Sequence, residues 1–305
     1  MTARGLKSTS ILGLAFLFLS ALHAEAQTTE RTYVSGHTGN DSNPCTLALP
    51  CQTLRAAMVA VRTFGEVVVL DTSEDTGLFG IPVTITKSLS IISAGGRAGI
   101  VGQLLVSPEA GGQVLLRGLD FMTSGVQVTT GLGLSLVIDD CTFYTASIAF
   151  QPSGTATSNL VVRNSIVSGN TGGTGILIQP TSTGKAVVAL ENVNVNNNQF
   201  GVRATDYANV TVRSSVISEN SASGIRCDSS VGAVSIFVEH TQSSHNAGNG
   251  VLAVGALALV RISDVTITDN TNGVYYVSGG TVCSFGNNSI AGNTVTLPPT
   301  PCPLS

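Results

Sequence analysis

The sequence contains no tryptophan, and only 10% of its 305 residues are charged. Soluble domains usually have about 25% charged residues. Lys and Arg number 14 against 18 Asp and Glu, which gives a formal net charge of −4. A chain without a basic surplus lacks the charges that neutralise a phosphate backbone. The composition therefore excludes a typical nucleic-acid-binding protein, and we predict no nucleic-acid partner.

The chain also lacks the sequence patterns of a metal site. It has no Cys-x-x-Cys pair, and its four histidines form no cluster along the sequence. We therefore predict no metal and no cofactor. Calcium enters only with the lyase alternative considered below.

The segment 1–26 resembles a secretory signal peptide. Arg4 and Lys7 precede an apolar run over positions 11–19, and the segment AEA, which ends at Ala26, offers a cleavage site. The run is shorter than the roughly 20 residues that a membrane-spanning helix needs. We therefore predict cleavage, a mature chain without a membrane span, and secretion to the periplasm or the cell exterior.

All six cysteines follow the predicted cleavage site, so they would meet an oxidising environment. Cys45 and Cys51 flank the short loop TLALP and are predicted to form a disulfide. Cys283 and Cys302 could staple the C-terminal tail in the same way. The pairing of those two cysteines stays open at this point.

A repeat dominates the sequence from about position 117 onward. A two-residue step recurs at a spacing typical of solenoid repeats and marks eight units. The steps are Arg117-Gly118, Asp139-Asp140, Arg163-Asn164, Glu191-Asn192, Arg213-Ser214, Glu239-His240, Ser263-Asp264 and Gly286-Asn287. The second residue belongs largely to the set that tolerates a left-handed backbone, so the step predicts a tight turn.

Further columns support this alignment. Three residues after each step the residue is apolar in seven of the eight units. Three residues later stands a column that is asparagine in the last six units: Asn170, Asn198, Asn220, Asn246, Asn270 and Asn293. A glycine followed by a β-branched residue then opens another short apolar run in five units. Each unit therefore predicts three short strands, joined by one tight, one medium and one loose turn.

Stacked coils of three parallel strands, about 4.8 Å apart, would explain such columns. The pattern resembles the right-handed parallel β-helix of the pectin-lyase-like superfamily, in particular its exported, repeat-only members. We predict an all-β fold, a single-stranded right-handed parallel β-helix, with coils of about 22–28 residues each. The resemblance implies a short N-terminal helix, roughly Thr53 to Val61, that caps the first coil.

The predicted boundaries follow from these segments. Residues 1–26 are the signal peptide, and residues 27–64 hold the disulfide loop and the capping helix. Residues 65–294 form the coils, and residues 295–305 form a Pro-rich tail.

Two columns are interpreted as structural. The first residue of the tight turn alternates in charge, which predicts ion pairs between neighbouring coils: Arg117, Asp139, Arg163, Glu191, Arg213 and Glu239. The asparagine column predicts a ladder of amides. Cys141 and Cys227 would lie three coils, roughly 14 Å, apart. A disulfide needs Cα atoms within about 7 Å, so we predict two separate, buried thiols.

The best candidate for a binding surface is the strand that follows the glycine. In sugar-acting relatives the working surface commonly lies along one strand face, and this strand matches it. Arg203 and Arg226 occupy equivalent places in neighbouring coils, with Asp206 and Asp228 close by in the sequence. Two stacked cations repel unless an anion lies between them, and an aspartate or an acidic sugar could fill that place. Tyr275, farther along, could offer a stacking face. An ordinary protein surface is the alternative.

No catalytic motif is complete. Asp139-Asp140 resembles the aspartate pair of polygalacturonases, but there is no Gly-His-Gly motif, and Arg261-Ile262 is followed by Ser263 instead of lysine. The sequence therefore favours a monomeric, non-catalytic module that binds a glycan or a cell surface, without naming a catalytic residue. The alternative is a polysaccharide lyase or hydrolase that acts on uronic-acid-containing polymers. A purely structural segment is a third hypothesis.

Overall fold

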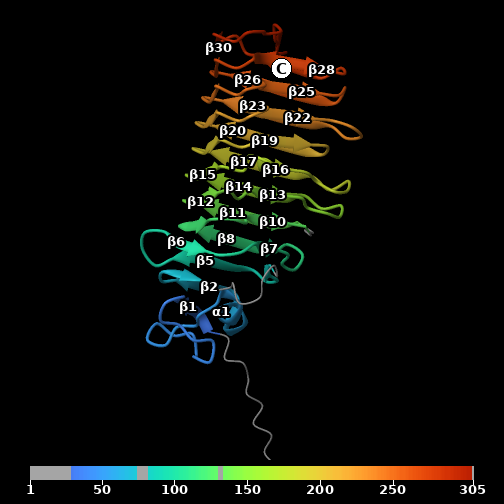
Figure 1. Ribbon diagram of the computed structural model, residues 1–305. Coiled ribbons are helices and arrows are strands. Elements are labelled where there is room, and N and C mark those ends of the chain that lie inside the picture. The colour runs from blue at the N-terminus through green and yellow to red at the C-terminus, as the bar shows by residue number, and fades with distance from the viewer. Residues whose placement is uncertain (1–28, 74–81, 130–132, 304–305) are drawn as a thin grey trace, which may run out of the picture.

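The computed structural model describes residues 29–73, 82–129 and 133–303 of the chain. Its strands stack into a long parallel β-helix with three faces, as Figure 1 shows. The predicted signal peptide lies outside the described residues. In the described part no helix has the length and apolarity that a membrane crossing requires.

Each face is one parallel sheet, here called sheets A, B and C. Sheet A contains β1 (Thr29–Val34), β2 (Val61–Val69), β5 (Leu89–Ser93), β8 (Gln113–Arg117), β11 (Ser135–Asp139), β14 (Ser158–Arg163), β17 (Ala186–Glu191), β20 (Ala208–Arg213), β23 (Val234–Glu239), β26 (Ala258–Ser263), β29 (Thr281–Ser284) and β31 (Thr300–Pro301). Sheet B contains β3 (Thr72–Ser73), β6 (Ala98–Ile100), β9 (Leu119–Phe121), β12 (Thr142–Tyr144), β15 (Ile166–Ser168), β18 (Asn194–Asn196), β21 (Val216–Ser218), β24 (Gln242–Ser244), β27 (Thr266–Thr268) and β30 (Ser289–Ala291). Sheet C contains β4 (Val83–Ile85), β7 (Leu104–Val106), β10 (Val126–Val128), β13 (Ile148–Phe150), β16 (Thr174–Ile178), β19 (Phe200–Thr205), β22 (Ile225–Asp228), β25 (Asn249–Val254) and β28 (Asn272–Val277). The predicted fold, an all-β parallel solenoid, is confirmed.

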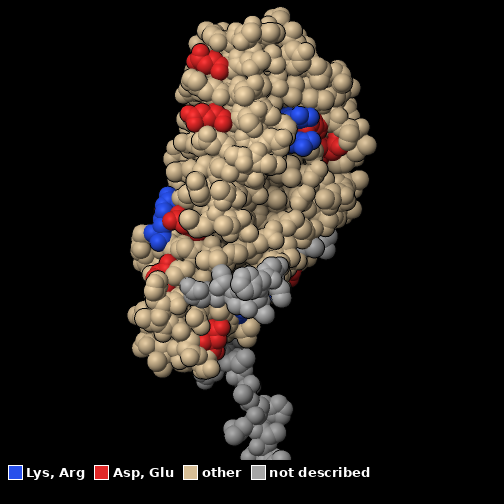
Figure 2. All heavy atoms as spheres, in the orientation of Figure 1, with Lys and Arg blue, Asp and Glu red and all other residues tan. Residues whose placement is uncertain are grey.

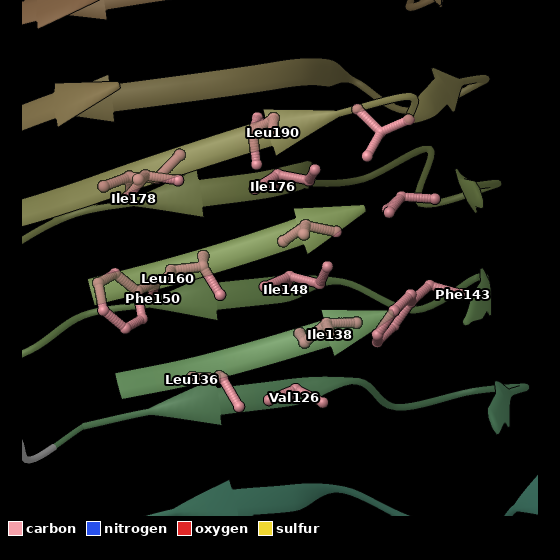
Figure 3. Close-up of a cluster of buried hydrophobic side chains, with 14 of the residues drawn as sticks. Val126, Leu136, Ile138, Phe143, Ile148, Phe150, Leu160, Ile176, Ile178 and Leu190 are labelled. Carbon is pink, nitrogen blue, oxygen red and sulfur yellow. The ribbon is translucent and has the colours of Figure 1, made fainter. Parts of the chain in front are cut away.

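The core runs along the axis of the coil. Most strands alternate, as β14 does, so their inward side chains meet those of the other two sheets and stack on the coils above and below. Figure 3 shows Ile138 of sheet A, Phe143 of sheet B and Ile148 of sheet C turned toward this shared interior. Phe121 and Phe143 stack with ring centroids 4.5 Å apart. Repetition of the same inward positions thus builds one continuous apolar column.

The tight turn between sheets A and B has the predicted left-handed residue. Its φ lies between 47° and 52° in six coils, at Asp140, Asn164, Asn192, Ser214, His240 and Asp264. A second left-handed position was not predicted. It precedes the asparagine column between sheets B and C, at Thr145, Gly169, Asn197, Glu219, His245, Asp269 and Gly292.

The asparagine column is a buried hydrogen-bonded ladder. The backbone N–H of each asparagine from Asn170 to Asn270 donates to Oδ1 of the asparagine one coil later, over 2.9–3.1 Å. From Asn198 onward Nδ2 donates to the same oxygen over 2.9–3.2 Å. One side chain thus ties each coil to the next at the same turn.

The charged column is less regular than the predicted alternation. Asp139 contacts Arg163 at 3.1 Å and Arg117 at 3.6 Å, and Arg213 contacts Glu239 at 2.6 Å. Glu191 forms no ion pair within the described residues, because Arg163 turns toward Asp139 and Arg213 toward Glu239. The prediction of an unbroken series is therefore wrong at this coil.

Both ends of the stack are covered. At the N-terminal end lies α1 (Leu54–Ala60), whose side chains Leu54, Ala57 and Met58 are buried (Figure 1). Cys45 and Cys51 form a disulfide beside it. At the other end a disulfide joins Cys283 to Cys302, and β31 adds to β29. Cys141 and Cys227 are separate buried thiols.

Candidate functional site

The outward side chains of sheet C form two parallel columns. The first column contains Leu105, Gln127, Ala149, Leu177, Arg203, Arg226, Leu252 and Tyr275 in register. The second stands two residues later in each coil and contains Ser107, Thr129, Gln151, Gln179, Thr205, Asp228, Val254 and Val277. Figure 2 shows this face as largely uncharged, apart from a blue cluster with red beside it over β19 and β22. That cluster is the candidate site.

The structure brings Arg203, Arg226 and Asp228 together at the predicted place. Arg203 Nε donates to Asp228 Oδ2 at 2.7 Å, and Arg226 Nε donates to both carboxylate oxygens at 2.8 and 2.9 Å. Asp228 is therefore the anion that allows two cations to stack on adjacent strands. Its side chain is only 15% exposed, against 33% for Arg203 and 27% for Arg226. The carboxylate is thus the least exposed of the three side chains, and both arginines reach the surface (Figure 2).

Phe200 supports the same pair. The guanidinium carbon of Arg203 lies 5.7 Å from the centroid of the Phe200 ring, and that of Arg226 lies 5.3 Å from it. A cation within about 6 Å of an aromatic ring is attracted to its face. The ring and the carboxylate thus hold both arginines in fixed positions. Phe200 was not among the residues predicted from the sequence.

The terminal nitrogens of the pair remain open for a ligand. Both arginines contact Asp228 through Nε, and no hydrogen bond from Nη1 or Nη2 of either one occurs within the described residues. Two arginines and one aspartate give the cluster a net charge of +1. Guanidinium nitrogens bind carboxylate, sulfate or phosphate oxygens as a fork. The geometry can therefore hold one small anionic group.

Asp206 lies outside this arrangement. Its Oδ1 accepts hydrogen bonds from the backbone N–H groups of Ser230, Val231 and Gly232 at 2.7, 3.1 and 2.9 Å. Burial opposes its charged form, yet the hydrogen bonds from Ser230 and this backbone lower the pKa of Asp206 below its ordinary value. In the structure Asp206 holds the loop beside the cluster and forms no ion pair with either arginine. Its predicted role in ligand binding stays a prediction.

Tyr275 is separated from the arginines. It stands two coils beyond Arg226, about 10 Å along the stack, with Leu252 between them. Leu252 is only 7% exposed although it points outward, so its neighbours cover it. Tyr275, Leu252, Val254 and Val277 form what we call the apolar zone. Tyr275 can offer a stacking face there but cannot share one small ligand group with the arginines.

A ladder of glutamines occupies the other side of the cluster. Gln103 Nε2 donates to Gln127 Oε1 at 2.9 Å, Gln127 Nε2 to Gln151 Oε1 at 3.3 Å, and Gln151 Nε2 to Gln179 Oε1 at 2.8 Å. We call these four residues the amide zone. The sequence analysis did not identify the ladder that these residues form. Their sequence separations of 24, 24 and 28, within the repeat length, were the available signal.

The aspartate pair that resembles a polygalacturonase motif lies elsewhere. Asp139 and Asp140 form the tight turn between sheets A and B, away from the outward columns of sheet C. Burial opposes ionisation of Asp139, but hydrogen bonds from Arg163 and Asn164 lower its pKa. The pair thus stabilises a turn, as the sequence register indicated. In the described part of the chain no three His, Cys, Asp or Glu side chains gather as a metal site would require.

Three stacked parallel sheets around one apolar column, with a polar strip along one of them, define a parallel β-helix protein. The sequence model of the family described as "Right handed beta helix region" matches residues 124–295. This match covers more than half of the chain, which therefore belongs to the right-handed β-helix family.

Two solved structures share the fold. One is a pectate lyase, Pel9A, with 18% identity and a TM-score of 0.50, over 90% of this chain and 77% of that one. The other is an alginate lyase from Paenibacillus sp. str. FPU-7, with 15% identity and a TM-score of 0.52, over 90% of this chain and 100% of that one. A comparison with curated proteins found no match. At such low identity the likeness shows the fold alone.

Proposed function

We propose that this protein is an exported, non-catalytic module that binds an acidic glycan at Arg203 and Arg226. One observation carries the proposal: two guanidinium groups are held side by side by Asp228 and Phe200, with their terminal nitrogens free toward the surface. A carboxylate on a sugar ring matches that fork in size and charge. Two solved structures that share this fold are a pectate lyase and an alginate lyase, which supports an acidic polymer as ligand.

The geometry favours binding over hydrolysis. Glycoside hydrolysis generally uses two carboxyl groups that face one bond. Among the described outward residues of sheet C from β7 to β28, Asp228 is the one carboxylate, and both of its oxygens already accept hydrogen bonds from the arginines. The second candidate is a polysaccharide lyase, favoured by the shared fold with two lyases.

Two further observations support export. The disulfides Cys45–Cys51 and Cys283–Cys302 are typical of proteins outside the cytosol. The segment 1–26 has the three-part pattern of a signal peptide. We therefore place the mature chain in the periplasm or outside the cell.

Binding to a panel of acidic and neutral polysaccharides, with and without calcium, tests the proposal. The variant Arg203→Gln/Arg226→Gln/Asp228→Asn removes all three charges together and so leaves no unpaired carboxylate. Two lost charge-assisted hydrogen bonds, at about 1.5–3 kcal/mol each, should weaken binding roughly 100-fold or more. The control Arg213→Gln removes an arginine from sheet A and should bind as the wild type does.

The same incubation separates the two candidate functions. Chain lengths of the polymers should stay unchanged after prolonged contact with the protein. Shortening of any polymer would instead establish the lyase or hydrolase alternative. Wild-type affinity in the triple variant would show that the ligand binds elsewhere.

A further inference from the structure

Positive charge on sheet C is confined to two adjacent coils. Among the described outward positions of the two columns from β7 to β28, only Arg203, Arg226 and Asp228 carry a charge. Six register steps separate Gln127 from Tyr275, which is about 29 Å at the usual strand spacing. The charged cluster occupies one of these six steps. A polymer lying along these two outward columns, here called the strip, would therefore meet mostly uncharged surface.

The amide zone suits uncharged sugars. A glutamine amide has two N–H donors and an oxygen with two lone pairs, and the ladder uses one donor and one lone pair of Gln127 and of Gln151. Within the described residues each of these half-buried side chains therefore keeps one donor and one acceptor for a ligand. A sugar hydroxyl is also both a donor and an acceptor. The zone offers pairs for hydroxyl groups without a charge to attract a carboxylate.

The apolar zone on the other side disfavours acids. Val254 and Val277 offer no side-chain donor, so a carboxylate laid against them would lose water without a replacement. Tyr275 adds a flat ring, which packs well against the C–H face of a sugar. This end of the strip therefore also matches a sugar without a charge.

The amide zone, the charged cluster and the apolar zone together distinguish between two kinds of acidic polymer. A polymer with an acid on every sugar would place several carboxylates on the amide and apolar zones, where the cluster with its net charge of +1 cannot neutralise them. Resting on the proposed function, we infer that the ligand is a heteropolysaccharide in which one acidic sugar is flanked on both sides by neutral sugars. The acidic sugar binds at Arg203 and Arg226, and neutral sugars follow Gln179 and Gln151 in one direction and Tyr275 in the other.

The test compares three oligosaccharides of matched length by calorimetry at physiological ionic strength. The first has a uronic acid on every sugar, and the second has one uronic acid per repeat of at least four sugars. The third is the second after chemical reduction of its carboxyl groups. The sparsely charged oligosaccharide should bind at least about tenfold tighter than either of the others.

A variant pair tests the amide zone. Gln151→Ala/Gln179→Ala removes hydrogen bonds to neutral sugars and should weaken binding of the sparsely charged oligosaccharide about tenfold. The control Asn159→Ala changes an exposed amide on sheet A and should leave the affinity unchanged. Full retention of affinity in Gln151→Ala/Gln179→Ala would overturn the path assigned to the neutral sugars. The oligosaccharide comparison uses the wild type, so it decides the inference even if the variant does not fold.

The outcomes separate this inference from the proposed function. If the fully charged oligosaccharide binds as tightly as the sparsely charged one, the inference fails and the proposed function stands. If the reduced oligosaccharide binds as tightly as its acidic parent, the acid is not recognised, and the proposed function fails with the inference. If none of the three oligosaccharides binds, both the inference and the proposed function fail.

Discussion

Replacement of Asn220 by leucine should destabilise the coil more than any exposed asparagine replacement does. Asn220 is 1% exposed, and its Oδ1 accepts the backbone N–H of Asn198 at 3.0 Å. Its Nδ2 donates to Asn246 Oδ1 at 2.9 Å, to Ser218 O at 3.0 Å and to Val195 O at 3.3 Å. Leucine has a similar length but neither accepts nor donates. The change therefore breaks the ladder in both directions.

The cost can be worked out from the groups that lose a partner. The backbone N–H of Asn198 loses its acceptor, Asn198 Nδ2 loses one of its three acceptors, and the carbonyls of Val195 and Ser218 each lose a donor. Asn246 Oδ1 keeps the backbone N–H of Asn220 at 3.1 Å. An unpaired buried group costs about 1–3 kcal/mol, and a carbonyl with a second lone pair costs less, so we expect a total of about 3–5 kcal/mol.

Thermal unfolding followed by circular dichroism measures this effect. At about 2–4 °C per kcal/mol for a chain of this size, Asn220→Leu should lower Tm by roughly 6–20 °C. Hydrogen exchange should also accelerate at the Asn198 amide, because that amide loses its acceptor. The control is Asn194→Leu on the outer face of β18, where the one side-chain hydrogen bond in the described part of the chain comes from Asn196 Nδ2. A fall in Tm no larger than that of the control would refute the ladder as a source of stability.

Two further predictions concern the cysteines. The Cys283–Cys302 disulfide closes a segment with a sequence separation of 19. The variant Cys283→Ser/Cys302→Ser should therefore lose about 3 kcal/mol of folding free energy, and its C-terminal tail should become the first site of proteolysis. An unchanged Tm and cleavage pattern would contradict this. Burial raises the pKa of the Cys141 and Cys227 thiols from 9.0 to about 12. Since the unfolded chain releases these protons at lower pH than the folded one, their contribution to stability should be full below about pH 9 and fall between pH 9 and 12. Urea unfolding across that pH range measures this loss of stability, and the variant Cys141→Ala/Cys227→Ala should show a smaller loss. Labelling of either thiol by a thiol reagent before unfolding would contradict the burial.

The repeat could be predicted because each coil has the same pattern of turn residues and apolar residues. Asn164 and Asn192 accept the left-handed backbone of the tight turn on their own, so residue type alone marks the turn. The second left-handed column is less uniform, because Thr145, Glu219 and His245 stand in it beside residues that tolerate this backbone, such as Gly169 and Asn197. Glu219 and His245 adopt φ of 57° and 54° because their N–H groups bond to the next coil, at Ser244 O and Thr268 O. Contacts between coils override the intrinsic preference at that turn.

The residues of the candidate site also differ in how far the sequence predicts them. Register alone placed Arg203 and Arg226 on adjacent strands, because equivalent positions stack in a solenoid. The role of Asp206 could not be predicted, since it depends on the conformation of the loop at Ser230, and the repeat does not fix its loops. Phe200 was missed for a similar reason. It stands before Gly201, where the simple in–out alternation of β19 does not hold.

The difference between inward and outward positions also explains why the fold does not identify the ligand. Inward positions must match the coils above and below, so they keep their apolar character through the whole stack. Outward residues of sheet C contact mainly their neighbours in the two columns, and a substitution there changes the strip without disturbing the core. The order of zones along the axis can therefore vary independently of the fold shared with pectate and alginate lyases. For this chain the position of the arginines between amides and apolar side chains is thus a better guide to the ligand than likeness to either lyase.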